Sequence, residues 1–362
     1  MDTHMTSADT ENAEAVAALP VPDLPPRILM DLRTDCNLKC PMCIVHGDPE
    51  NPAVKGILRR SMSVEQSRRI LDEVMAAKPL IQPSLWSEPT LAHDFQEHVR
   101  AMKERGATVA MNTNGLLLTE ATARFLVEAG VDSVSVSVDS MTPETLMKVR
   151  GINKLDKIHR GIENLLAARG DAATPRIGVS FTLQDANRHE LDAFVAHWTR
   201  KVDVVRVGEL FIGPDGFPNV RTAGPRQPCH ALYSTMAIHV DGNVSLCCLD
   251  GFGDTNVGNV FKDGVRGVWH GPKLTEVRRL HEQGRYDEVP FCTNCDRWAS
   301  NAYEEEIRDG LLIRRSAEYT YYNRIDRLTN WTGSLQNTHA SPTLAQAGQT
   351  AGDATDGQSG RG

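Results

Sequence analysis

The eight cysteines of this chain have the most distinctive spacing of any residue type in the sequence. Three of them, Cys36, Cys40 and Cys43, lie within the eight-residue segment Cys-Asn-Leu-Lys-Cys-Pro-Met-Cys. A zinc site usually takes four ligands, often arranged in C-x₂-C pairs. Three close cysteines without a fourth suit a four-iron cluster that leaves one iron open to a further ligand. The alternative is a Cys₃His zinc site completed by His46.

The other five cysteines all lie in the last part of the chain. Cys292 and Cys295 form a C-x₂-C pair, and Cys229 and Cys247 can supply two distant thiolates. Such a set fits either a Cys₄ zinc ribbon or a second iron–sulfur cluster. Cys248 is then a spare thiol next to Cys247.

Composition and charge exclude several classes of protein. The 362 residues carry a formal net charge of −8, whereas a nucleic-acid footprint needs clustered Lys and Arg. No apolar run approaches the length of a membrane span, and the acidic N-terminus does not resemble a secretory signal. We therefore expect a cytoplasmic protein, in which cysteines stay reduced, without a nucleic-acid or membrane partner.

The middle of the chain alternates short apolar runs with amphipathic stretches of helical period. This alternation predicts parallel βα units, forming either an open doubly wound sheet or a complete or partial barrel. In all of these folds, ligands bind beyond the carboxyl ends of the strands. The predicted strands are Arg27–Arg33, Ile81–Trp86, Ala107–Asn112, Ser133–Val138, Arg176–Thr182 and Asp203–Gly208.

Polar or sulfur-bearing side chains follow nearly every one of these strands, so one rim should carry the functional site. They are Cys36, Glu88, Asn114, Ser137, Asp139, Gln184, Asn187 and Glu209. A polar loop composition alone accounts for much of this set, although not for the cysteine.

Four segments are expected along the chain. Residues 1–25 and 331–362 have the composition of disordered tails, and 26–212 form the βα domain. From about residue 213, turns rich in Gly and Pro replace the βα repeat. Residues 213–330 should form a smaller domain around the remaining cysteines, with strands at Ala237–Val240 and Val244–Cys247 and a helix near Leu274–Glu282.

The CxxxCxxC segment after the first strand resembles the signature of the radical S-adenosylmethionine (SAM) superfamily. The resemblance implies an α/β fold with a partial (β/α)₆ barrel and a 4Fe–4S cluster. Its open iron would bind the amino and carboxylate groups of SAM. Once reduced by a flavodoxin- or ferredoxin-type donor, this cluster would cleave SAM to a 5′-deoxyadenosyl radical. Met42 stands where the family usually has an aromatic residue near the adenine.

Further segments match the same family in the expected order. Ser87-Glu88-Pro89 resembles its Gly-Gly-Glu-Pro segment, in which the carboxylate accepts from the methionine ammonium. The stretch from 112 to 119, which includes Asn114, resembles the third-strand segment. Ser137-Val-Asp139 followed by Arg150 resembles the segment in which Ser and Arg hold the SAM carboxylate, a role that suits the planar fork of Arg.

The later cysteines resemble the single-cluster "twitch" form of the SPASM domain. The resemblance implies a second 4Fe–4S cluster, held by Cys229, Cys247, Cys292 and Cys295. That cluster would relay electrons or staple the small domain together.

Twitch enzymes of this size resemble the dehydrogenases and epimerases that act on aminocyclitols, aminoglycosides and related sugars in antibiotic assembly. The resemblance implies dehydrogenation of a carbinol on a small sugar-like substrate. Arg206, Glu209, Asp250 and His230 could orient or deprotonate that substrate, although each is also an ordinary structural or surface residue type.

Other reactions remain open. Cys248 is either a hydrogen donor, which would make an epimerase, or a buried small apolar residue. Decarboxylation of a sugar acid and modification of a peptide fit the same cofactors. A non-enzymatic iron–sulfur carrier or zinc module is also possible, but it has no need of Glu88, Ser137 and Arg150.

Overall fold

The computed structural model describes residues 19–57, 59–213, 216–217, 219–220 and 224–330. The predicted C-terminal tail and residues 1–18 of the predicted N-terminal tail lie outside these ranges. Residues 19–25 pack against the C-terminal end of helix α9 (Val260–Trp269). The indole nitrogen of Trp269 donates to the Pro22 carbonyl at 2.8 Å, and Arg266 forms an ion pair with Asp23.

The described chain forms an α/β fold, which confirms the predicted class. Its strands are β1 (Arg27–Met30), β2 (Leu80–Gln82), β3 (Thr108–Thr113), β4 (Ser133–Ser137), β5 (Arg176–Leu183), β6 (Val204–Glu209), β7 (Thr235–Ile238), β8 (Asn243–Ser245), β9 (Asn256–Asn259), β10 (Tyr303–Arg308), β11 (Leu311–Ser316) and β12 (Tyr319–Arg324). Its α-helices are α1 (Pro52–Ile57), α2 (Val64–Val74), α3 (Phe95–Glu104), α4 (Glu120–Glu128), α5 (Pro143–Arg150), α6 (Leu155–Arg169), α7 (Leu191–Trp198), α8 (Ala231–Ser234), α9 (Val260–Trp269) and α10 (Pro272–Glu282).

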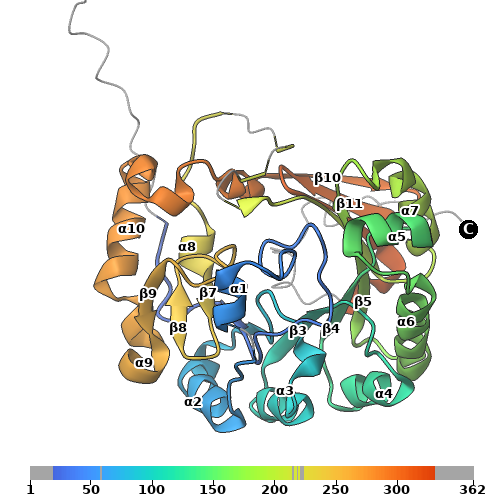
Figure 1. Cartoon of the computed structure of the whole chain (residues 1–362), viewed down its shortest axis with the longest axis horizontal. Helices are drawn as coiled ribbons and strands as arrows, with labels where there is room; N and C mark the ends of the chain where they lie inside the picture. Colours follow the sequence, from blue (N-terminus) through green and yellow to red (C-terminus); the bar gives the residue numbers. More distant parts are fainter. Residues whose placement is uncertain (1–18, 58, 214–215, 218, 221–223, 331–362) are drawn as a thin grey trace, which may run out of the picture.

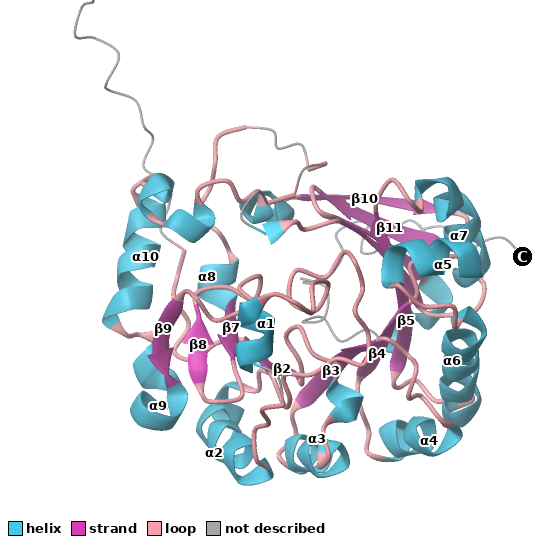
Figure 2. Cartoon of the chain, viewed as in Figure 1, coloured by secondary structure: helices cyan, strands magenta, loops and turns pink. Residues whose placement is uncertain are grey.

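All the described strands join one sheet, in the order β10-β11-β12-β6-β5-β4-β3-β2-β1-β7-β8-β9. The six predicted strands, β1 to β6, are parallel neighbours at its centre. The sheet curves into a partial barrel with the helices α2, α3, α4 and α6 outside it, and the segment carrying α1 lies over its middle (Figures 1 and 2). None of the described helices has the length and apolar character needed to span a membrane.

The helices form where the sequence supplies both a cap and an apolar stripe. At α2, the Ser63 hydroxyl accepts from the Gln66 backbone N–H at 3.2 Å, and the Gln66 side chain accepts from the Ser63 N–H at 2.8 Å. This capping box satisfies two N–H groups that a helix start leaves without partners. The apolar side chains of Ile70, Leu71 and Val74 recur at helical spacing and are buried on one face of the helix.

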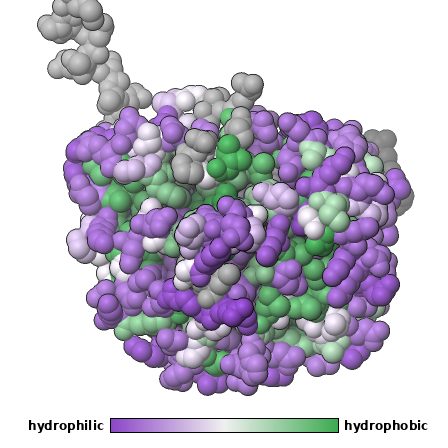
Figure 3. All heavy atoms as spheres, viewed as in Figure 1, coloured by the Kyte–Doolittle hydropathy of each residue, from purple (hydrophilic) through white to green (hydrophobic). Residues whose placement is uncertain are grey.

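The second part of the chain builds both edges of the same sheet, rather than standing apart from it. Strand β7 pairs in parallel with β1, whereas β12 pairs antiparallel with β6. One hydrophobic core runs through both parts and includes Ile28, Val179 and the fully buried Trp269. On the face seen in Figure 3, hydrophilic side chains cover most of the rim and hydrophobic ones show between them.

The sequence analysis missed the hairpins from β10 to β12. These strands carry several charged residues, including one buried ion pair, so they do not show the alternation of apolar and polar residues that identifies a strand. The Arg314 guanidinium Nε donates to Glu305 across β10 and β11 at 2.7 Å, and both side chains are only 4% exposed. Strands β1 and β2 are also shorter than predicted. Beyond them, the Asp31 carboxylate ties the two strand ends together by accepting from Leu85 N–H at 2.7 Å.

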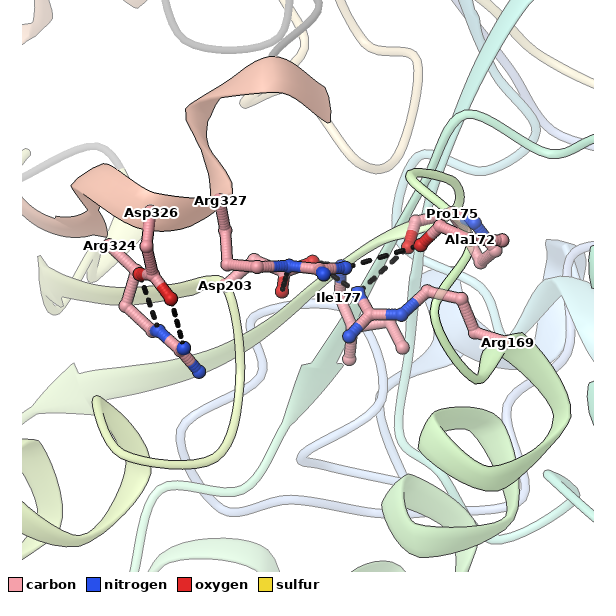
Figure 4. Close-up of polar contacts among 8 residues, drawn as sticks. All are labelled: Arg169, Ala172, Pro175, Ile177, Asp203, Arg324, Asp326 and Arg327. Carbon is pink, nitrogen blue, oxygen red and sulfur yellow. Dashed lines mark hydrogen bonds and ion pairs between the residues drawn. The ribbon is translucent and has the colours of Figure 1, made fainter.

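A buried carboxylate fixes the start of β6 (Figure 4). Asp203 is 1% exposed and accepts from the backbone N–H of Ile177 in β5 at 2.8 Å. It also forms ion pairs with Arg169, at the end of α6, and with Arg327 at 3.2 Å. The two arginines donate to the carbonyls of Pro175 and Ala172, so Asp203 holds β5, β6, α6 and the end of the described chain together.

We predict that Asp203→Asn costs about 3 kcal/mol of unfolding free energy, because it leaves buried guanidinium groups without their counter-charge. Urea unfolding followed by tryptophan fluorescence measures this loss. Asp326→Asn is the control: Asp326 also pairs with an arginine, Arg324, but it is 62% exposed and should change stability by less than about 0.5 kcal/mol. Equal effects of the two substitutions would contradict the assignment.

Candidate functional site

The three clustered cysteines follow β1 and line a single cavity of about 320 Å³. Backbone N–H groups point at two of the sulfurs, from Leu38 to Cys36 Sγ at 3.4 Å and from His46 to Cys43 Sγ at 3.3 Å. Burial raises the pKa of the Cys36 thiol to about 12. Thiolates at this position therefore need a nearby positive charge, which a bound metal cluster supplies. The donor set fits an iron–sulfur cluster.

His46 does not join the three cysteines. Its ring lines a separate, smaller cavity with Asp31 and His239. Among the described residues, no three His, Cys, Asp or Glu side chains converge closely enough to hold a single metal ion. The Cys₃His arrangement considered from the sequence is not formed, because His46 and the three cysteines line different cavities.

Glu88 lies at the same cavity, and its carboxylate is surrounded by donors. It is 2% exposed and accepts from the Thr113 hydroxyl at 2.8 Å, the Asn114 backbone N–H at 2.7 Å and the Thr90 hydroxyl at 2.6 Å. Burial raises the pKa of Glu88, and these hydrogen bonds counteract part of that rise. The Asn114 side chain also lines the cavity and donates to the Asn37 side chain at 2.6 Å.

Arg150 reaches the cavity from α5, where Asp139 holds it. The Asp139 carboxylate, which is fully buried, accepts from the Arg150 Nε at 2.6 Å and from the Thr182 backbone N–H at 2.7 Å. Asp139 has a φ of 64°, a left-handed conformation that Asp tolerates better than most residues. Ser137, at the end of β4, lines the cavity beside Arg150. Asp139 positions Arg150 and is not itself among the lining residues.

Met42 also lines the cavity. The Gln184 side chain, which follows β5, donates to the Met42 sulfur at 2.9 Å. Met42, Glu88, Asn114, Ser137 and Arg150 therefore all face the cavity that the cysteines line, whereas Asp139 acts through Arg150.

The five later cysteines gather at a second place. Burial raises the pKa of Cys229 to about 11, and the neighbouring Cys295 and Cys248 raise it further. Burial likewise raises the pKa of Cys292 to about 12, with Cys229 and Cys295 nearby. A hydrogen bond with Cys248 raises the pKa of Cys247, which also lies close to Cys229. These buried thiols need the same metal compensation as the first set.

Comparisons with known proteins match both regions. Residues 32–195 match the radical SAM superfamily, and residues 229–296 match the iron–sulfur cluster-binding SPASM domain. The chain carries a radical SAM domain and a SPASM domain. Its cofactors are therefore SAM and iron–sulfur clusters, in agreement with the two cysteine sets.

Part of the chain is also similar to curated proteins. The GTP 3′,8-cyclase of Aeromonas hydrophila subsp. hydrophila is 31% identical over 186 residues, which are 48% of this chain and 52% of that protein. The chain spans about half the length of the curated relatives it matches.

Solved structures share the fold. The histidine-tagged anSMEcpe with bound AdoMet is 15% identical, with a TM-score of 0.57, over 90% of this chain and 99% of that one. Streptococcus suis SuiB bound to precursor peptide SuiA is 15% identical, with a TM-score of 0.54, over 71% of this chain and 67% of that one.

Of the four residues predicted to orient or deprotonate the substrate, two line the cavity that holds the first cysteine set, and two do not. Arg206 and Glu209 reach it from β6. The Asp250 carboxylate instead organises its own loop, accepting from Gly253 N–H at 2.9 Å and from the Thr255 N–H and hydroxyl at 2.8 and 2.6 Å. His230 lies at the start of α8 and is not among the lining residues.

The sequence analysis missed Glu318 and Tyr319, which line the cavity from β12 and the residue before it. Glu318 is 2% exposed and forms an ion pair with Arg297. Arg297 follows Cys295 by two residues. This short separation is the sequence signal that could have indicated that Arg297 lies near the later cysteines.

Trp86 joins the radical SAM domain to the SPASM domain. Its indole N–H donates to the Cys248 carbonyl at 3.0 Å. Gly251 packs under it so closely that an added Cβ would lie 2.3 Å from Val45 Cγ2 and 2.9 Å from Trp86 Cδ1. The loop after the first cysteines and the loop after Cys248 thus meet at a place that only glycine fits.

We predict that Gly251→Ala destabilises the protein by about 1–3 kcal/mol, because the new methyl group must push Val45 or Trp86 away. It should also lower the iron retained per chain after reconstitution, since both cysteine loops meet there. Thermal unfolding and iron analysis measure the two effects.

Gly267→Ala is the matched control. An added Cβ at Gly267 would meet only Asp263 Cβ, at an ordinary 3.5 Å. Alanine favours a helix over glycine by about 1 kcal/mol, so this change should leave iron content unchanged and not reduce stability. Unaltered iron content and stability in Gly251→Ala would show that the contact is dispensable.

Proposed function

We propose that this radical SAM enzyme removes hydrogen from a carbohydrate-like small molecule and oxidises a carbinol to a ketone. The observation that supports this most strongly is the extent of one cavity. It begins at Cys36, Cys40 and Cys43 and reaches Leu249, the residue after Cys247 and Cys248. A substrate bound there lies between the two cysteine sets.

When bound, the first cluster supplies the electron that splits SAM into methionine and a 5′-deoxyadenosyl radical, and the second supplies an electron acceptor. The residues of this chain position SAM. Glu88 accepts from the methionine ammonium, and Arg150 with Ser137 binds the methionine carboxylate. Met42 and Asn114 border the nucleoside. Asp139 keeps the Arg150 fork turned towards the cavity.

Glu209 and Arg206 are placed to handle the substrate. The Glu209 Oε2 atom is buried and has no hydrogen-bond partner, and burial raises the pKa of this carboxyl. Glu209 therefore suits the role of a base that accepts the hydroxyl proton while the adjacent C–H hydrogen is lost. One hydrogen atom, one proton and one electron leave the carbinol, which balances its conversion to a ketone.

An epimerase with Cys248 as hydrogen donor is less well supported. Of the described residues, Leu249 lines the cavity and Cys248 does not.

Reduced cysteine ligands require a reducing compartment, so we propose a cytoplasmic location and a flavodoxin- or ferredoxin-type electron donor.

Anaerobic reconstitution tests the function. The intact chain should bind about eight iron and form 5′-deoxyadenosine in the presence of dithionite. Cys40→Ala should abolish SAM cleavage and leave about four iron, because the second set is intact. Cys295→Ala should cleave SAM without forming the ketone. SAM cleavage by Cys40→Ala would refute the cluster assignment, and deuterium from the solvent at a product carbon would indicate hydrogen return instead of oxidation.

Glu88 gives a prediction for pH. SAM affinity should fall as the pH falls through the raised pKa of Glu88, since only the carboxylate attracts an ammonium group. Glu88→Gln should bind SAM about tenfold more weakly at neutral pH, with a flatter pH profile. Titration calorimetry from pH 5 to 8 measures both.

The raised pKa of Glu88 also makes the free energy of unfolding depend on pH. A carboxyl with a raised pKa in the folded state adds stability below its unfolded pKa, and that stability is lost as pH rises through the folded value. Glu88→Gln should lack this loss. Glu120→Gln, on the exposed face of α4, is the control and should match the unaltered protein in SAM binding and stability. A Glu88→Gln variant with unchanged SAM affinity would exclude the ammonium contact.

A further inference from the structure

A second cavity, the inner cavity, has a volume of about 120 Å³ and lies towards the amino ends of the parallel strands, and the charge of its lining is unusual. Its lining includes the three arginines Arg27, Arg206 and Arg297 and no acidic side chain. Serine, amide and tyrosine side chains complete its polar lining, namely Ser133, Ser135, Gln82, Asn112, Tyr319 and Tyr321. The volume is several times the ~30 Å³ that a water molecule occupies in the liquid.

Among the described residues, one of these three cations, Arg297, has a carboxylate within ion-pair distance. Glu318 pairs with Arg297 and also accepts from the Ser300 hydroxyl at 2.8 Å. Among the described residues, neither Arg27 nor Arg206 has a carboxylate within ion-pair distance, and the Nε atoms of both are buried without a hydrogen-bond partner. Burial lowers the pKa of Arg27, and the neighbouring Arg297 also lowers it, so the free protein holds this buried charge at an energetic cost.

Local contacts hold the three guanidinium groups in place around the cavity. The Arg27 NH2 group donates to the Gln82 side chain at 2.8 Å. The guanidinium carbons of Arg206 and Arg297 lie 4.8 and 5.5 Å from the centre of the Tyr319 ring, and the Tyr319 hydroxyl accepts from Arg297 at 2.9 Å. Gly208 leaves room for that ring, because an added Cβ would lie 2.8 Å from Tyr319 Cε1. The arginines are therefore positioned before any ligand binds.

We propose that this inner cavity binds an oxyanion, a phosphate or carboxylate group, carried by the substrate. Arginine forks match both groups through paired N–H donors. The identification of the anion's carrier as the substrate rests on the proposed function. Asn112, Arg206 and Tyr319 line both this cavity and the larger one. A substrate anchored by its anionic end at the arginines thus presents its remaining carbons between the two cysteine sets.

Thermal unfolding of the full chain, reconstituted and loaded with SAM, tests the site. Inorganic phosphate and acetate are added separately, at an ionic strength matched with chloride. Phosphate, acetate or both should raise the unfolding midpoint, and the stronger of the two identifies the group. Absence of any rise over chloride would overturn the proposal.

Arg206→Gln and Arg27→Gln should each weaken oxyanion binding at least tenfold. Without an added anion, the midpoint of Arg27→Gln should equal or exceed that of the unaltered protein, because a buried charge without an ion-pair partner is gone. A merely structural arginine would instead lower the midpoint under both conditions, and that result would contradict the site. Arg160→Gln, with an arginine 70% exposed on α6, is the control and should bind like the unaltered protein.

The same samples are assayed for 5′-deoxyadenosine. Anion binding without SAM cleavage would support the inner site and refute the proposed function. SAM cleavage without anion binding would refute the inner site and leave the proposed function standing.

Discussion

The pairing of β7 with β1 and of β12 with β6 is the constraint on which the site depends. A partial barrel of six parallel strands leaves two edges, each with unpaired backbone N–H and C=O groups. In this chain, both edges are covered by strands from its second part. The β12 pairing also brings Glu318 and Tyr319 to the cavity, where Glu318 pairs with Arg297, two residues after Cys295. The cavity is thus closed by backbone hydrogen bonding and not by side chains alone.

Buried ion pairs then fix the details inside that frame. Asp203 secures the start of β6, Asp139 holds Arg150, and Glu305 pairs with Arg314. A buried pair contributes little net stability relative to an apolar pair of the same shape, but losing one partner is costly. Such pairs therefore specify one arrangement of strands and side chains. The arginines of the inner cavity are different, because among the described residues only Arg297 has a carboxylate within ion-pair distance.

The sequence predicted the parts of the fold and site that follow local patterns. The six central strands appeared as apolar runs, Cys36 and Glu88 followed predicted strands, and Arg150 matched a segment of the radical SAM superfamily. The strands β10 to β12 could not be found in this way, because their inward side chains include Glu305 and Arg314, whose charges are satisfied only across the sheet. Glu318 and Tyr319 were missed for the same reason. Asp250 was considered as a residue that orients or deprotonates the substrate. Its carboxylate instead accepts hydrogen bonds from its own loop. Local sequence does not distinguish a carboxylate that binds substrate from one that organises a loop.

The SPASM match ends at residue 296, but the sheet continues to Arg324. A chain cut at the end of that match would keep every cysteine and still lose the neighbour of β6. Its bare strand edge would be open to pairing with another molecule, and aggregation would follow from the missing hairpins and not from any defect in cluster binding. The boundary of a recognisable domain and the boundary of a self-sufficient folding unit therefore differ in this protein by the length of three strands.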